Sequence, residues 1–157
     1  MRVQIFLRWL AVIGQLGAVL VVGFGLEFQL PIIELLFTIS ASVLLNAWLA
    51  LRYPVSHMLT GREAAGYLAY DLTQLGILLY LTGGLMNPFA LLFLAPVTLS
   101  ASVMQARTTA LLVGLASGWV TGLLFFHQPL PWSGPAPVLH SISVVCIWAA
   151  LLLALEL

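Results

Sequence analysis

Long apolar runs occupy most of this chain, and they limit what it can fold into. Of its 157 residues, 62% are hydrophobic and only 6% are charged, too few charges for the surface of a soluble protein. Runs of about 18 or more apolar residues are typical of transmembrane helices. The runs do not alternate polar with apolar residues, as the strands of a membrane barrel do. We therefore expect an all-α membrane protein.

Six apolar stretches are each close to the roughly 20 residues that a spanning helix requires. They predict three helical hairpins with short connectors, forming a single transmembrane domain over residues 1–157. The expected spans are Trp9–Gly25, Ile32–Leu51, Ala64–Thr82, Pro88–Met104, Thr108–Phe126 and Val138–Leu157. Because the sequence is still apolar at Leu157, we expect that it is the membrane part of a longer protein.

The arginines all fall on one side of the membrane in this arrangement. They are Arg2, Arg8, Arg52, Arg62 and Arg107. The opposite connectors contain no Arg, and basic residues favour the cytoplasmic side, so we expect both termini in the cytoplasm. In a bacterium this predicts a multi-pass protein of the inner membrane. The chain offers no basic patch that could neutralise phosphates, which argues against nucleic acid as a partner.

Ionisable side chains inside a membrane are costly, so Asp71 in the third expected span is a candidate functional residue. Tyr67, Asp71 and Gln74 share one helical face. Gln15 lies deep in the first expected span and needs a partner on another helix. These four residues form a possible intramembrane polar cluster. Its role is either structural, holding helices together, or functional, in ligand binding or proton transfer.

Two further features favour structural interpretations. Glu34 follows Pro31 in the first turn of the second expected span, where the helix dipole favours a carboxylate. Gly114, Gly118 and Gly122 recur every four residues in the fifth, leaving a smooth face that another helix can approach. For these glycines we favour packing within the chain over a dimer face. The spacing of the histidines does not resemble a metal-ligand set, and we expect no metal site.

The connector GGLMNPF, Gly83–Phe89, lies on the side without arginines, and much of it predicts a turn. Gly83 and Gly84 can end one helix, because glycine tolerates the left-handed conformation found after helix ends. Asn87 is a favoured cap for the next helix, and Pro88 is favoured at its first position.

The turn leaves Leu85, Met86 and Phe89 unexplained. We expect them to form an apolar group at the membrane surface, beside the amide of Asn87. An aromatic ring and an amide suit a flat, lipophilic, carbonyl-bearing ligand, the ring by stacking and the amide by a hydrogen bond. A quinone fits this description and dissolves in the bilayer.

This heptapeptide resembles the GGLxNPF sequence of the RegB/PrrB/ActS family of redox-sensing histidine kinases. RWLAVIGQ, Arg8–Gln15, resembles the start of that family's first span. DLTQLGILLYLTGGLMNPFALLFLAPVTLSA, Asp71–Ala101, resembles its third and fourth spans almost throughout. The similarity is to the transmembrane sensor region only. The residues that match the family's motif are Gly83, Gly84, Leu85, Asn87, Pro88 and Phe89, with Met86 at the variable position.

The resemblance implies a membrane-embedded, redox-sensing input domain that binds ubiquinone near the heptapeptide. In the family, quinone occupancy or redox state sets the activity of a cytoplasmic kinase, which phosphorylates the response regulator of a two-component system. The family also implies a homodimer. The kinase region is absent here, since neither a phosphoacceptor-helix pattern nor Gly-rich nucleotide-binding boxes occur. We therefore expect the full-length protein to be a sensor histidine kinase and these 157 residues to be non-catalytic by themselves.

Two other functions compete with this one. A small proton-coupled transporter or channel subunit would use Asp71 and Glu34 as coupling carboxylates, although the chain shows no inverted repeat. An intramembrane serine protease would need Gly-x-Ser-Gly, and Leu115 occupies the first glycine position before Ser117 and Gly118. The transporter or channel is the stronger alternative.

Overall fold

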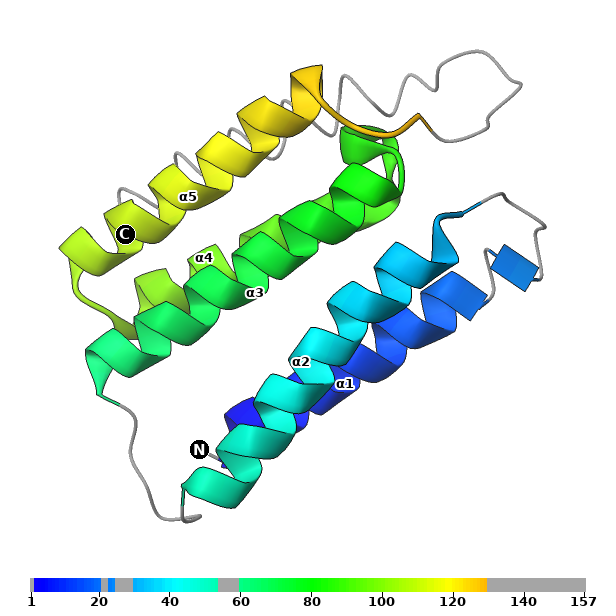
Figure 1. The fold of residues 1–157 in the computed structure, drawn as a ribbon. Coiled ribbons are helices and arrows are strands. Elements are labelled where there is room, and N and C mark those ends of the chain that lie inside the picture. Colours follow the sequence, from blue (N-terminus) through cyan, green and yellow to red (C-terminus); the bar gives the residue numbers. More distant parts are fainter. Residues whose placement is uncertain (1, 21–22, 25–29, 54–59, 130–157) are drawn as a thin grey trace. The chain divides into compact units, whose positions relative to one another are not determined.

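The computed structural model describes residues 2–20, 23–24, 30–53 and 60–129, which form helices and short connectors without a strand among them. They fall into two compact units, Met1–Thr60 and Gly61–Leu157 (Figure 1). The expectation of an all-α fold is confirmed for this part of the chain. The expected sixth span, Val138–Leu157, lies outside the described residues.

The first unit is a pair of helices, α1 (Arg2–Leu20) and α2 (Ile32–Arg52), packed against each other. α1 starts well before the expected Trp9, because the residues that precede it are mostly apolar and compatible with a helix. α2 begins directly after Pro31, and Glu34 lies exposed in its first turn, as predicted. The buried side chains of α2 recur every three or four residues, which places them on one face. They are Leu35, Ile39, Ser42, Asn46 and Leu49.

In its described part, residues 61–129, the second unit has three α-helices that pack against one another, with α4 behind α3 in the view of Figure 1. They are α3 (Gly61–Leu81), α4 (Leu94–Val103) and α5 (Ala106–Phe125). The bounds of α3 and α5 agree closely with the third and fifth expected spans. Two 3-10 helices, η2 (Gly84–Met86) and η3 (Pro88–Phe93), connect α3 to α4.

The expectation of one continuous α-helix over Pro88–Met104 is wrong in its first part. The chain runs through η3 before α4 begins at Leu94. The first hydrogen bond of η3 is of the 3-10 type. The N–H of Ala90 donates to the carbonyl of Asn87, three residues earlier, over 2.9 Å. Such tight turns are frequent at helix N-termini, and here they extend over six residues.

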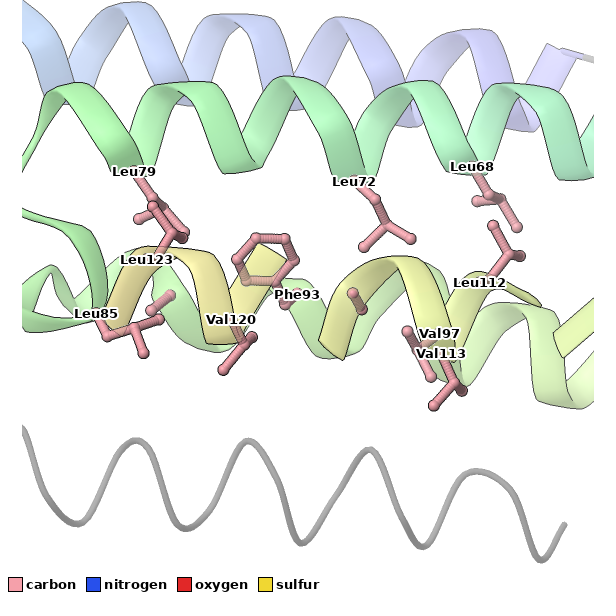
Figure 2. Packing of buried hydrophobic residues seen from close by; sticks show 12 residues of the cluster. Leu68, Leu72, Leu79, Leu85, Phe93, Val97, Leu112, Val113, Val120 and Leu123 are labelled. Atoms are coloured by element: carbon pink, nitrogen blue, oxygen red, sulfur yellow. The ribbon is translucent and has the colours of Figure 1, made fainter. Parts of the chain in front are cut away.

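A buried apolar cluster holds the second unit together (Figure 2). Leu68 and Leu72 are four residues apart on α3, so they share the face that packs on α5. Phe93 from η3 is fully buried, and its ring lies between α3 and α5 in Figure 2. The members of the cluster are Leu68, Leu72, Leu79, Leu85, Ala90, Phe93, Val97, Leu112, Val113, Ala116, Val120 and Leu123.

Gly76 allows α3 and α5 to pack closely. A Cβ atom at this position would overlap the ring of Trp119, so the indole occupies space that only glycine leaves free. The three glycines of α5 differ from it. Apart from the adjoining residues and backbone of α5 itself, no atom of the described residues lies within 4 Å of a Cβ placed at Gly114, Gly118 or Gly122. The helix that we expect to approach this smooth face therefore stays a prediction.

The exterior of both units is strongly apolar. α2 and α5 are long and apolar enough to cross a bilayer. Exposed side chains include Ile33 (82%), Leu51 (89%) and Leu111 (76%). Large apolar surfaces are unfavourable in water, so these features together indicate association with a membrane. The number of spans and the cytoplasmic location of the termini remain predictions.

Candidate functional site

The turn after α3 is made by two consecutive glycines in the left-handed conformation. Gly83 has a φ of 98° and Gly84 a φ of 61°. A residue with a Cβ atom is disfavoured in this conformation by about 1–2 kcal/mol. The N–H of Met86 donates to the carbonyl of Gly83 (3.2 Å), and the N–H of Asn87 to that of Gly84 (3.3 Å). The prediction that Gly-Gly ends this helix is confirmed.

Asn87 connects the end of α3 to the beginning of η3. Its Oδ1 accepts a hydrogen bond from the N–H of Phe89 (2.9 Å), and Pro88 occupies the first helical position, so the predicted cap is confirmed. Its Nδ2 lies 2.8 Å from Oγ1 and 3.2 Å from the carbonyl oxygen of Thr82. Thr82 Oγ1 donates in turn to the carbonyl of Leu78 (2.7 Å). The amide of Asn87 is therefore engaged within the turn itself.

The apolar residues of the heptapeptide divide between the core and the surface. Leu85 is only 1% exposed and belongs to the buried cluster, so the expectation that it lies at the membrane surface is wrong. The reason is that η2 packs against α5, which turns this side chain inward. Met86 is partly buried. Phe89 is 47% exposed, and its ring is the large apolar group that the turn leaves accessible.

The chain that follows α5 returns to the same turn. The ring of His127 lies against Gly84, where a Cβ atom would be 2.7 Å from Cγ of the imidazole. The N–H of Gln128 donates to the carbonyl of Tyr80 near the end of α3 (2.8 Å). The sequence alone did not single out His127. The predicted topology indicated only that the two connectors could be close, because it places the heptapeptide and the connector after α5 on the same side of the membrane.

The polar residues of the third expected span lie on α3, away from the turn in sequence. Gln74 is buried, with 7% of its surface exposed, while Tyr67 and Asp71 are partly buried. Gln15 is partly buried on α1, which belongs to the other unit. A polar cluster that includes all four residues remains a prediction.

The side chains at the turn can contact a ligand by aromatic stacking and by hydrogen bonding. Phe89 offers an exposed aromatic face, and His127 offers an imidazole beside the glycine backbone. Within the described part of the chain, no three His, Cys, Asp or Glu side chains gather in a way that could hold a metal ion. The arrangement suits a flat ligand with an apolar ring and polar oxygens.

Comparison with known proteins finds two relatives, and both are named sensor histidine kinase RegB. Over 130 residues, 83% of this chain, the sequence is 45% identical to the sensor histidine kinase RegB of Cereibacter sphaeroides. A second RegB sequence, from a strain of the same species, is 46% identical over 75 residues, or 48% of this chain. The chain spans 28% of the length of the first relative and 16% of the second. No family model and no solved structure matches it.

Proposed function

Because the chain belongs to the RegB family over these 130 residues, we propose that it is the membrane input region of a quinone-sensing histidine kinase. The observation that carries the proposal is the combination of this similarity with the heptapeptide turn. That turn fixes its own backbone through the amide of Asn87 and leaves Phe89 exposed. Both relatives are sensor histidine kinases by name, and we propose the same activity for the full-length protein.

The proposed location is the bacterial inner membrane, with six spans and both termini in the cytoplasm. The two long apolar helices, α2 and α5, and the exposed apolar side chains support a membrane location. The placement of every arginine on one side supports the orientation. With this orientation the heptapeptide lies at the outer face, where a ligand dissolved in the bilayer reaches it from the outer leaflet.

The proposed ligand is ubiquinone, bound at the heptapeptide. Its site consists of Gly83, Gly84, Leu85, Asn87, Pro88 and Phe89, but these residues have different roles. The ring of Phe89 stacks on the quinone head group, because it is exposed and aromatic. Leu85 and Asn87 act indirectly, by anchoring the turn to the core and to Thr82. The left-handed glycines keep the backbone bare, so a ligand can approach it closely.

Quinone binding then sets the activity of a cytoplasmic kinase that acts on a response regulator, in a homodimer. A ligand at the turn contacts the connection between α3 and η3, so it acts on the packing of two elements at once. Signalling requires that the ligand bind the two signalling states with different affinity, since equal affinity shifts no equilibrium.

The proposal is tested by titrating the chain in nanodiscs with a short-chain ubiquinone and following tryptophan fluorescence. We expect saturable quenching that Phe89→Ala abolishes or weakens strongly. Phe37→Ala is the matched control, because Phe37 is an exposed phenylalanine (78%) on α2, remote in sequence from the turn. Quenching that rises linearly with quinone, or that is identical in the wild type and both variants, would mean partitioning into lipid and would refute the site.

A further inference from the structure

The proposed quinone site needs a polar partner for the oxygens of the head group, and Asn87 does not supply one readily. Its Oδ1 already accepts from the N–H of Phe89, and its Nδ2 contacts both oxygens of Thr82. A ligand oxygen would have to break one of these bonds in order to use the amide. A different side chain at the turn is therefore needed for the hydrogen bond.

His127 has the chemistry and the position. Its Nδ1 lies 3.0 Å from the carbonyl oxygen of Leu123. A carbonyl oxygen only accepts hydrogen bonds, so Nδ1 must carry the proton. In the neutral ring this leaves Nε2 with a lone pair and without a proton. Nε2 makes no hydrogen bond with any residue in the described part of the chain.

The ring is also held close to the heptapeptide. It lies against Gly84, whose missing side chain makes room for it, and the neighbouring bond from Gln128 to Tyr80 ties its backbone to the end of α3. Gly84 and Phe89 are five residues apart, a separation of at most about 18 Å even for a fully extended chain. It is shorter here, because η2 is a helical turn and Asn87 bonds back to Thr82.

We propose that His127 is the hydrogen-bonding residue of the quinone site, and that its Nε2 accepts a hydrogen bond from a hydroxyl of the reduced ligand, the quinol. This inference rests on the proposed function. The carbonyl oxygens of the oxidised quinone cannot donate, so they gain nothing from a neutral Nε2. The tautomer that Leu123 imposes therefore makes His127 a residue that distinguishes the two redox forms of the ligand.

The test compares two variants of His127 in the complete chain in nanodiscs. The amide of His127→Asn can take the place of Nδ1 and keep the bond to Leu123, but it leaves nothing at Nε2. The longer side chain of His127→Gln reaches the Nε2 position with its amide oxygen. Binding of a short-chain ubiquinone and of its reduced form is measured anaerobically for each variant, with melting temperatures alongside.

We expect His127→Asn to weaken quinol binding roughly two- to tenfold, the effect of one hydrogen bond, with quinone binding unchanged. His127→Gln should retain most of the quinol affinity. A structural role alone would be preserved in Asn and would not separate the two redox forms. The inference is overturned if His127→Asn binds quinol like the wild type, or loses both forms equally.

Failure of the proposed function looks different. In that case neither redox form binds the wild type saturably, and Phe89→Ala has no effect on either. If the wild type binds, Phe89→Ala is impaired and both His127 variants behave like the wild type, the quinone site stands and His127 has no part in it.

Discussion

Two helix connections in the described part of the second unit differ greatly in construction. α4 passes to α5 through Met104 and Gln105 alone, and the bonds there are between backbone groups. The N–H of Met104 donates to Ser100 (2.8 Å), and that of Thr109 to Gln105 (3.1 Å), without a capping bond from the Gln105 side chain. The connection from α3 to η3 adds two left-handed glycines, a capping amide bonded to Thr82 and a buried leucine.

The difference shows how little a reversal of the chain requires. Two residues and ordinary backbone bonds are enough between α4 and α5, so a turn by itself does not explain the heptapeptide. The additional interactions hold the backbone of Gly83–Phe89 in one conformation and leave an aromatic ring exposed beside it. A backbone held by several hydrogen bonds beside an accessible ring supports the ligand site proposed above.

The largest effect should come from the residue that anchors the α3–α4 connection in the core. Phe93→Ala removes a fully buried ring and should lower the free energy of unfolding by about 3–5 kcal/mol, measured by denaturant titration in detergent micelles. Val103→Ala, at the end of α4 beside the simple connection, is 70% exposed and should have little effect. Equal losses of unfolding free energy for the two variants would contradict the difference between the α3–α4 and α4–α5 connections.

Gly84→Ala should be the next most damaging change. It forces a Cβ atom into the left-handed conformation and to within 2.7 Å of the His127 ring, so we expect a loss of about 2 kcal/mol. Gln105→Ala is the corresponding change in the simple connection and should lie within about 0.5 kcal/mol of the wild type. A well-tolerated alanine at Gly84 would show that the turn is looser than the structure describes.

Asn87→Ala removes the cap of η3 together with the contacts to Thr82, and should cost about 1–2 kcal/mol. Asn87→Asp keeps the acceptor for the N–H of Phe89 but loses the donor to Thr82, so its loss should be about half as large. Melting temperatures of the two variants, measured side by side, separate the two contributions. Identical melting temperatures for Asn87→Ala and Asn87→Asp would assign the whole effect to the lost contacts with Thr82.

The smallest effect is expected from insertion of one glycine after Gln105. Lengthening a short exposed connection adds little loop-closure entropy, so the melting temperature should change only slightly. The same insertion after Leu85 should lower it more, because it displaces the buried side chain and the capping amide from their partners. If both insertions behaved alike, the interactions of the heptapeptide would contribute little to stability.

Local features of the turn could be predicted from the sequence, and those that depend on distant residues could not. The roles of Gly83, Asn87 and Pro88 follow from conformational preferences of the residues themselves, and the structure bears them out. The burial of Leu85 depends on where α5 (Ala106–Phe125) lies, which begins some twenty residues later, and no periodicity within the heptapeptide contains that information.

His127 illustrates the same limit for the site. Its contact with Gly84 brings together two connectors that only the packing of α3 on α5 makes neighbours. The expectation of a continuous fourth helix failed for a related reason. Apolar composition predicts that Pro88–Phe93 is helical, but α and 3-10 helices use the same residue types, so composition cannot separate them.

The 3-10 form of η3 affects how far this part of the chain extends. Six residues rising about 2.0 Å each span about 12 Å, and the ten residues of α4 add about 15 Å, together about 27 Å along their axes. The same sixteen residues in α form would reach only about 24 Å. A hydrocarbon core is about 30 Å thick, which α3 and α5 match with 21 and 20 α-helical residues. Because of its 3-10 part, the shorter segment Pro88–Val103 comes close to the same length with sixteen residues. For the predicted fourth span, hydrophobic matching to the bilayer would thereby come from a larger rise per residue instead of from more residues.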